Sequence, residues 1–117
     1  MRTPIVAARL AQLLSAFREA ADAYALARLE FATEHPRIAA PPALRLGGDV
    51  AASRDCWDFI EAQTETARRF VEMLGARSQG GVASDAAGLR LRARVRDLDR
   101  YARAVRVVLT VEERGDL

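Results

Sequence analysis

The sequence has a single cysteine, Cys56, so the chain can form no internal disulfide and no zinc site built on several thiolates. It also lacks long hydrophobic runs, because Arg9, Arg18, Arg28 and later arginines interrupt each one well before the length of about 18 residues that a membrane span needs. We therefore expect a protein without a membrane-spanning segment that is suited to a reducing compartment, the cytoplasm.

Lysine and asparagine are absent, and all 18 basic residues are arginine, against 16 acidic residues, for a formal net charge of +2. The planar guanidinium group presents a fork of donors that suits phosphate and carboxylate, which favours a nucleic-acid or protein interface. A GC-rich genome would produce the same excess of arginine and the 24 alanines without any selection for binding. The positions of the arginines must therefore decide between these interpretations.

Aromatic residues are scarce at 6%, whereas 50% of the residues are hydrophobic and 29% are charged. This balance favours a packed helical domain over a disordered chain. With 117 residues there is room for one core, so we expect a single helical-bundle domain over residues 1–117.

The first predicted helix covers residues 4–34. Thr3 can cap its free amide groups and Pro4 suits the first helical position, while Pro36 disfavours helical geometry at His35. Apolar residues then recur at alternating steps of four and three, which places them on one helix face. This face comprises Val6, Leu10, Leu13, Phe17, Ala20, Tyr24, Ala27 and Phe31.

Residues 36–48 form a proline- and glycine-rich connection that cannot continue a helix, with Ile38, Leu44 and Leu46 available to hold it against the core. A second helix is predicted over residues 50–77, with Asp49 as a candidate cap. Its core-facing positions follow the same spacing, and Trp57 and Val71 widen the face. They are Cys56, Ile60, Gln63, Ala67, Phe70 and Leu74.

A third helix is predicted over residues 84–113, where Ser84 and Asp85 can cap its start. Its core-facing positions are Leu91, Val95, Leu98, Ala102, Val105 and Leu109. A strand over 105–111 remains an alternative, because branched residues also alternate there at period two. The sequence thus predicts an all-α fold, an antiparallel bundle of three long helices with coiled-coil-like contact faces.

Few residues suggest catalysis. Arg28 and His35 form an Arg-x6-His arrangement that loosely resembles the Arg-x4-6-His motif of HEPN ribonucleases, in which both residues converge on a scissile phosphate. Leu29 stands where that family usually has a polar residue, so we interpret His35 as a residue of the helix end. Cys56 lies on the core face without a nearby base. We expect no enzyme activity and no cofactor.

No metal site is predicted either, because the carboxylates of the second helix lack the Glu-x-x-His pairs of a diiron bundle. Those carboxylates instead cluster on the side away from the core, where we expect them to form an acidic protein interface. This acidic face comprises Asp58, Glu61, Glu65 and Glu72.

The third helix carries arginines on the side opposite its core residues, with Asp99 among them. This arginine face comprises Arg92, Arg96, Arg100, Arg103 and Arg106. Like charges at i,i+4 cost a few tenths of a kcal/mol per pair, which favours a neutralising partner. Asp99 can pair with Arg96 and Arg103, and Asp97 with Arg100. Leu89 and Val107 also point outward on this side and could supply adhesion to a partner protein.

Two functions follow as hypotheses. The first is a non-enzymatic assembly subunit whose arginine face contacts an RNA or DNA backbone in a ribonucleoprotein or phage-like complex; small subunits of CRISPR effector complexes resemble this chain by class only. The second is a protein-only adaptor or homo-oligomer, in which the acidic face of one copy docks head to tail on the arginine face of the next. In both cases the chain belongs to a larger complex.

Overall fold

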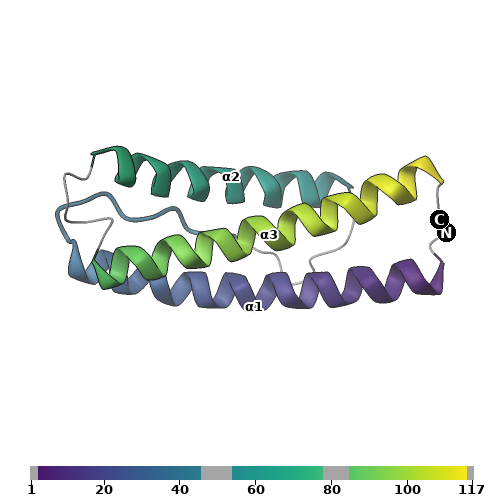
Figure 1. The fold of residues 1–117 in the computed structure, drawn as a ribbon, viewed down its shortest axis with the longest axis horizontal. Helices are drawn as coiled ribbons and strands as arrows, with labels where there is room; N and C mark the ends of the chain where they lie inside the picture. Colours follow the sequence, from purple (N-terminus) through teal and green to yellow (C-terminus); the bar gives the residue numbers. More distant parts are fainter. Residues whose placement is uncertain (1–2, 46–53, 78–84, 116–117) are drawn as a thin grey trace.

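The computed structural model describes residues 3–45, 54–77 and 85–115, which form three helices and no strand (Figure 1). The helices are α1 (Pro4–Glu34), α2 (Arg54–Arg77) and α3 (Ala86–Arg114). The predicted all-α bundle is confirmed: α1 has the expected bounds and α2 ends at the expected residue. The predicted start at residue 50 and the predicted cap Asp49 lie outside the described residues. The predicted bounds 84–113 of the third helix differ slightly, because Asp85 is an extended cap and α3 runs from Ala86 to Arg114.

The strand considered for residues 105–111 is wrong, because these residues belong to α3. Val105 and Leu109 are buried one helical turn apart, whereas Val107 is 61% exposed on the outer side. The branched residues therefore follow the helical period, since the core of the bundle has a place only for every third or fourth side chain.

The starts of α1 and α3 carry the predicted caps Thr3 and Asp85. The Val6 amide donates to the Thr3 hydroxyl over 3.2 Å at the start of α1, and the Gly88 amide donates to the Asp85 carboxylate over 2.8 Å at the start of α3. Gly115 ends α3 with a left-handed backbone at φ 70°, a conformation in which glycine avoids the clash of a Cβ atom. These contacts satisfy amide groups that a helix cannot pair internally.

The three helices do not contribute equally to the packing. α3 packs against both α1 and α2 and runs antiparallel to each (Figure 1). Among the described residues, the Cα atoms of α1 and α2 stay more than 8 Å apart. Aromatic side chains bridge this space, Phe17 to Trp57 with ring centroids 5.3 Å apart and Phe31 to Phe70 at 6.3 Å.

The connecting segment, residues 36–45, occupies the space between α1 and α2 (Figure 1). The Tyr24 hydroxyl donates to the Pro42 carbonyl over 2.5 Å, and Arg28 Nε donates to the Pro41 carbonyl over 2.6 Å. On the other side, Gln63 of α2 accepts from the Arg45 amide and donates to the Arg45 carbonyl. The extended segment thus links α1 to α2 through its main-chain groups.

His35, at the end of α1, contacts Asp85, at the start of α3. His35 Nε2 lies 2.6 Å from the Asp85 carboxylate, and the His35 ring packs on Phe31 with centroids 4.7 Å apart. The hydrogen bond from the Gly88 amide, together with this histidine, lowers the pKa of Asp85. The core-facing residues predicted for α1 and α3 are all buried. The prediction for Gln63 of α2 is wrong, because Gln63 is only half-buried and its neighbour Thr64 is the buried residue. None of the three described helices has the length and apolar character that crossing a membrane requires.

Candidate nucleic-acid interface

The arginine face lies on the outer side of α3, as the helical phase predicts. Arg96 is exposed, whereas Leu98, two residues along the helix, is completely buried. Arg92, Arg100 and Arg103 are exposed as well. Arg106 differs, because its side chain is only 25% exposed and lies against α2. The five arginines therefore divide into four that face solvent and one that belongs to the contact between helices.

Arg106 binds the acidic face of its own chain. Its Nε and Nη2 atoms donate to the two oxygens of Glu61 over 2.9 and 2.8 Å, and Nη2 also donates to Asp58. Trp57 Nε1 donates to the same Glu61 carboxylate over 3.0 Å. The hydrogen bonds with Glu61 and Asp58 raise the pKa of Arg106. The sequence suggests that the acidic face of one copy pairs with the arginine face of another. In the structure, these opposite charges pair within a single copy.

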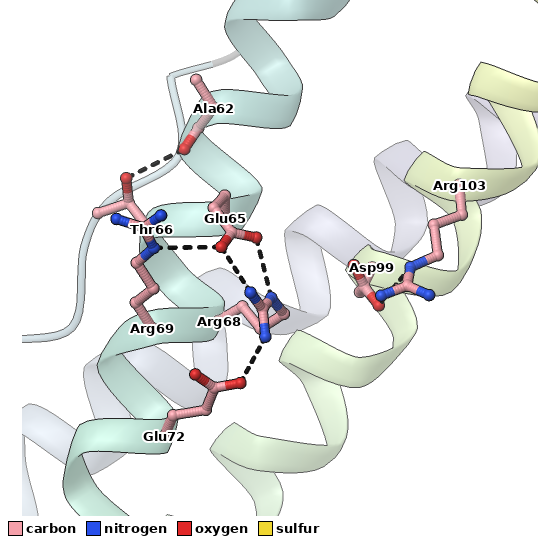
Figure 2. A network of polar contacts seen from close by, with 8 residues as sticks. All are labelled: Ala62, Glu65, Thr66, Arg68, Arg69, Glu72, Asp99 and Arg103. Carbon is pink, nitrogen blue, oxygen red and sulfur yellow. Dashed lines mark hydrogen bonds and ion pairs between the residues drawn. The ribbon is translucent and has the colours of Figure 1, made fainter.

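The rest of the acidic face is neutralised by arginines of α2 itself (Figure 2). Arg68 donates two hydrogen bonds to Glu65, at 2.9 and 2.5 Å, and a third to Glu72, while Arg69 donates to Glu65 over 3.1 Å. The hydrogen bonds from Arg68, assisted by Arg69, lower the pKa of Glu65 to about 2. Each carboxylate of the acidic face therefore has an arginine partner in its own chain.

The solvent-facing arginines are neutralised much less. Arg103 pairs with Asp99 over 3.0 Å, and the Arg100 guanidinium lies 5.0 Å from the Tyr101 ring centre. Among the described residues, Arg92 and Arg96 form no ion pair, so the expected pair between Asp99 and Arg96 is wrong. The expected pair between Asp97 and Arg100 is wrong, because Asp97 lies 3.6 Å from Arg94 instead. Uncompensated positive charge thus concentrates at Arg92, Arg96 and Arg100.

Two depressions follow the valley between α2 and α3 beside these arginines. The smaller, of about 200 Å³, is lined by Arg68, Arg92 and Arg96 above Val71 and Val95. The larger, of about 520 Å³, has Thr64, Ala102 and Val107 among its lining residues. Asp99 lines both. This valley was not predicted from the sequence, although the small residues Thr64 and Ala102, both buried here, were a signal for it.

The larger depression has a charged rim. Glu61 and Glu65 reach it from α2, and Asp99, Arg103 and Arg106 reach it from α3. Glu61 is bound by Arg106, Glu65 by Arg68 and Asp99 by Arg103, so each of the three rim carboxylates has an arginine partner. The rim therefore combines carboxylate acceptors with guanidinium planes around a less polar floor.

Exposed apolar residues occur on all three helices. Leu89 and Val107 are 54% and 61% exposed, in agreement with the predicted outward positions. Leu26 and Leu29 of α1 and Phe59 of α2 are more than half exposed as well. Apolar exposure is therefore not concentrated on the arginine face, and only Val107 belongs to the valley between α2 and α3.

Arg28 and His35 have separate structural partners: Arg28 holds the connecting segment, while His35 contacts Asp85 of α3. The side chain of Cys56, predicted to be buried, lies outside the described part of the structure. Within the described residues, no group of three or more His, Cys, Asp or Glu side chains is placed to hold a metal ion. Comparison of the chain with protein-family models, with curated proteins and with solved structures finds no match.

Proposed function

We propose that the protein is a non-enzymatic assembly subunit whose α3 arginine face contacts a nucleic-acid backbone. The observation that carries this proposal is the row Arg92, Arg96 and Arg100, exposed on one helix face and without an ion-paired carboxylate among the described residues. Four-residue steps along a helix separate such side chains by about 6 Å, so several can reach one strand. Guanidinium groups bind phosphate oxygens with paired hydrogen bonds.

The charge distribution favours nucleic acid over a second copy of the chain. Docking of the acidic face on the arginine face requires free carboxylates, but Arg68 and Arg106 already bind those of α2. Such a contact would exchange existing ion pairs for equivalent ones and gain little free energy. Phosphates, by contrast, would neutralise the repulsion between like charges at i,i+4 on α3. We place this role in a ribonucleoprotein or phage-like complex of the cytoplasm.

Fluorescence anisotropy with labelled oligonucleotides of equal length tests the proposal. We expect the logarithm of the association constant to fall with the logarithm of salt concentration at a slope of about −2 to −3, which corresponds to three phosphate contacts. Replacing Arg92, Arg96 and Arg100 together with glutamate should weaken binding about 100-fold at low salt.

A charge-matched control separates this site from net charge. Arg9, Arg37 and Arg45 are exposed on α1 and the connecting segment, and replacing all three with glutamate changes the net charge equally. We expect the control to retain most of the binding. Equal loss in both triple variants, or none in the first variant once circular dichroism shows it folded, would contradict the proposal.

A further inference from the structure

The larger depression between α2 and α3 extends the arginine face towards the C-terminal end of α3. Arg92 and Arg96 line the smaller depression, Arg103 and Arg106 line the larger one, and Asp99 lies between them in the sequence and borders both. A strand whose phosphates lie along Arg92 and Arg96 would therefore bring its next nucleotide over the larger depression. This reasoning rests on the proposed function and concerns the class of nucleic acid that the site accepts.

The size of the larger depression suits a small organic group. Its volume of about 520 Å³ falls within the roughly 300–1,000 Å³ typical of small-molecule sites. Thr64 and Ala102 are 3% and 4% exposed, and the Thr64 hydroxyl is already bonded to the Ile60 carbonyl of its own helix. The floor consequently offers van der Waals contact rather than free polar groups.

The rim determines which part of a nucleotide fits. Arg103 and Arg106 are already bound to Asp99 and Glu61, so the rim presents no guanidinium without an anionic partner and disfavours a phosphate. Arginines occupy both oxygens of Glu61 and of Glu65, whereas Arg103 contacts only Oδ2 of Asp99. The other Asp99 oxygen can therefore accept a hydrogen bond from an amino group, and guanidinium planes stack on bases. A neutral base that carries an exocyclic amino group satisfies both conditions, whereas a base with a carbonyl group at the same place would face carboxylate oxygens.

We propose that this depression holds one unstacked base of a single-stranded nucleic acid, with cytosine favoured over uracil or thymine. Cytosine and uracil have the same ring and differ at position 4, where cytosine presents an amino donor and uracil a carbonyl acceptor. A paired duplex keeps its bases stacked inside the helix and cannot place one in the depression without extrusion. The site therefore distinguishes single strands from duplexes as well as cytosine from uracil.

The test compares oligo-C, oligo-U and a duplex of equal length by anisotropy, each as RNA and as DNA. We expect wild-type protein to prefer oligo-C over oligo-U by about fivefold, a modest effect for a single base contact. Asp99→Asn should remove this preference without weakening oligo-U binding, because it removes a carboxylate but no arginine. The matched control is Asp97→Asn, the same change at a residue that pairs with Arg94 and does not line the depression.

A second variant tests whether the larger depression must be empty to accept the base. Ala102→Leu should fill the depression and reduce the preference for single strands over duplex, while the salt dependence from Arg92 and Arg96 stays unchanged. Equal binding of oligo-C, oligo-U and duplex by wild type, or the same preference in Asp99→Asn as in Asp97→Asn, would overturn the base site and leave backbone binding intact. Loss of the proposed function would appear differently, as failure of every oligonucleotide to bind.

Discussion

Leu98 offers the sharpest test of the helical phase on which the arginine face depends. Its side chain is completely buried in the middle of α3, the helix that packs against both of the others. Leu89 lies on the same helix but is 54% exposed. The substitutions Leu98→Ala and Leu89→Ala are chemically identical, so intrinsic helix propensity contributes equally to both. The difference between their effects on the free energy of unfolding therefore measures the contribution of burial.

The expected magnitude follows from the atoms removed. Leu→Ala deletes three carbon groups, and at about 0.8 kcal/mol for each buried group the transfer cost at Leu98 is about 2.4 kcal/mol. Incomplete collapse of the site adds to this at about 24 cal/mol per Å³ of remaining cavity. We therefore expect Leu98→Ala to lower the free energy of unfolding by about 2.5–5 kcal/mol, a large part of the stability of a small domain.

Urea unfolding followed by far-UV circular dichroism measures this difference through the transition midpoint. Leu89→Ala should change the free energy of unfolding by less than about 0.5 kcal/mol, as should Arg96→Ala on the exposed face. Similar destabilisation by Leu98→Ala and Leu89→Ala would show that α3 is rotated relative to the bundle. The assignment of Arg92, Arg96 and Arg100 to solvent would then fail as well.

Three further predictions concern ionisable groups. The arginine partners of Glu65 lower its pKa from 4.5 to about 2. The stability that this carboxylate contributes is therefore present above pH 4.5 and is lost as the pH falls towards 2. In an acid titration, the free energy of unfolding of Glu65→Gln should decline less steeply than that of wild type. Burial raises the pKa of Tyr24 from 10.0 to about 12. The stability that the protonated hydroxyl contributes is therefore complete below pH 10 and is lost as the pH rises towards 12. In urea melts, Tyr24→Phe should lack this loss of stability at alkaline pH. Arg106→Ala should cost about 1 kcal/mol, and a double-mutant cycle with Glu61→Ala that shows no coupling energy would contradict the ion pair between α2 and α3.

The periodicity of the sequence was sufficient to predict the helices and the buried faces of α1 and α3, but on α2 it selected Gln63 instead of the buried Thr64. All eight core positions predicted for α1, from Val6 to Phe31, are buried, and so are the six predicted for α3. The spacing of apolar residues determines which side of a single helix faces the core, and it depends only on the local sequence. For the same reason, the exposure of Arg92, Arg96 and Arg100 could be predicted without knowledge of the neighbouring helices.

Gln63 shows where local pattern becomes insufficient. Its position on the core-facing side of α2 follows from the spacing, but its partner is the backbone of Arg45, which the connecting segment brings against α2. An amide side chain on this side of the helix needs a hydrogen-bonding partner, but the sequence does not specify which group of the chain provides it. The path of an extended segment depends on the groove available to it, which exists only after α1 and α2 are positioned.

The roles of the charged residues were decided by tertiary structure. The sequence predicts opposite charges on the outer sides of two helices, but the angle between those sides is set by how α2 rotates against α3. In the folded chain that rotation brings Arg106 onto Glu61 and Asp58, and it places Thr64 near Ala102 where the larger depression opens. A single helix determines which of its residues avoid the core, whereas the packing of two helices determines which of those residues remain available to a partner.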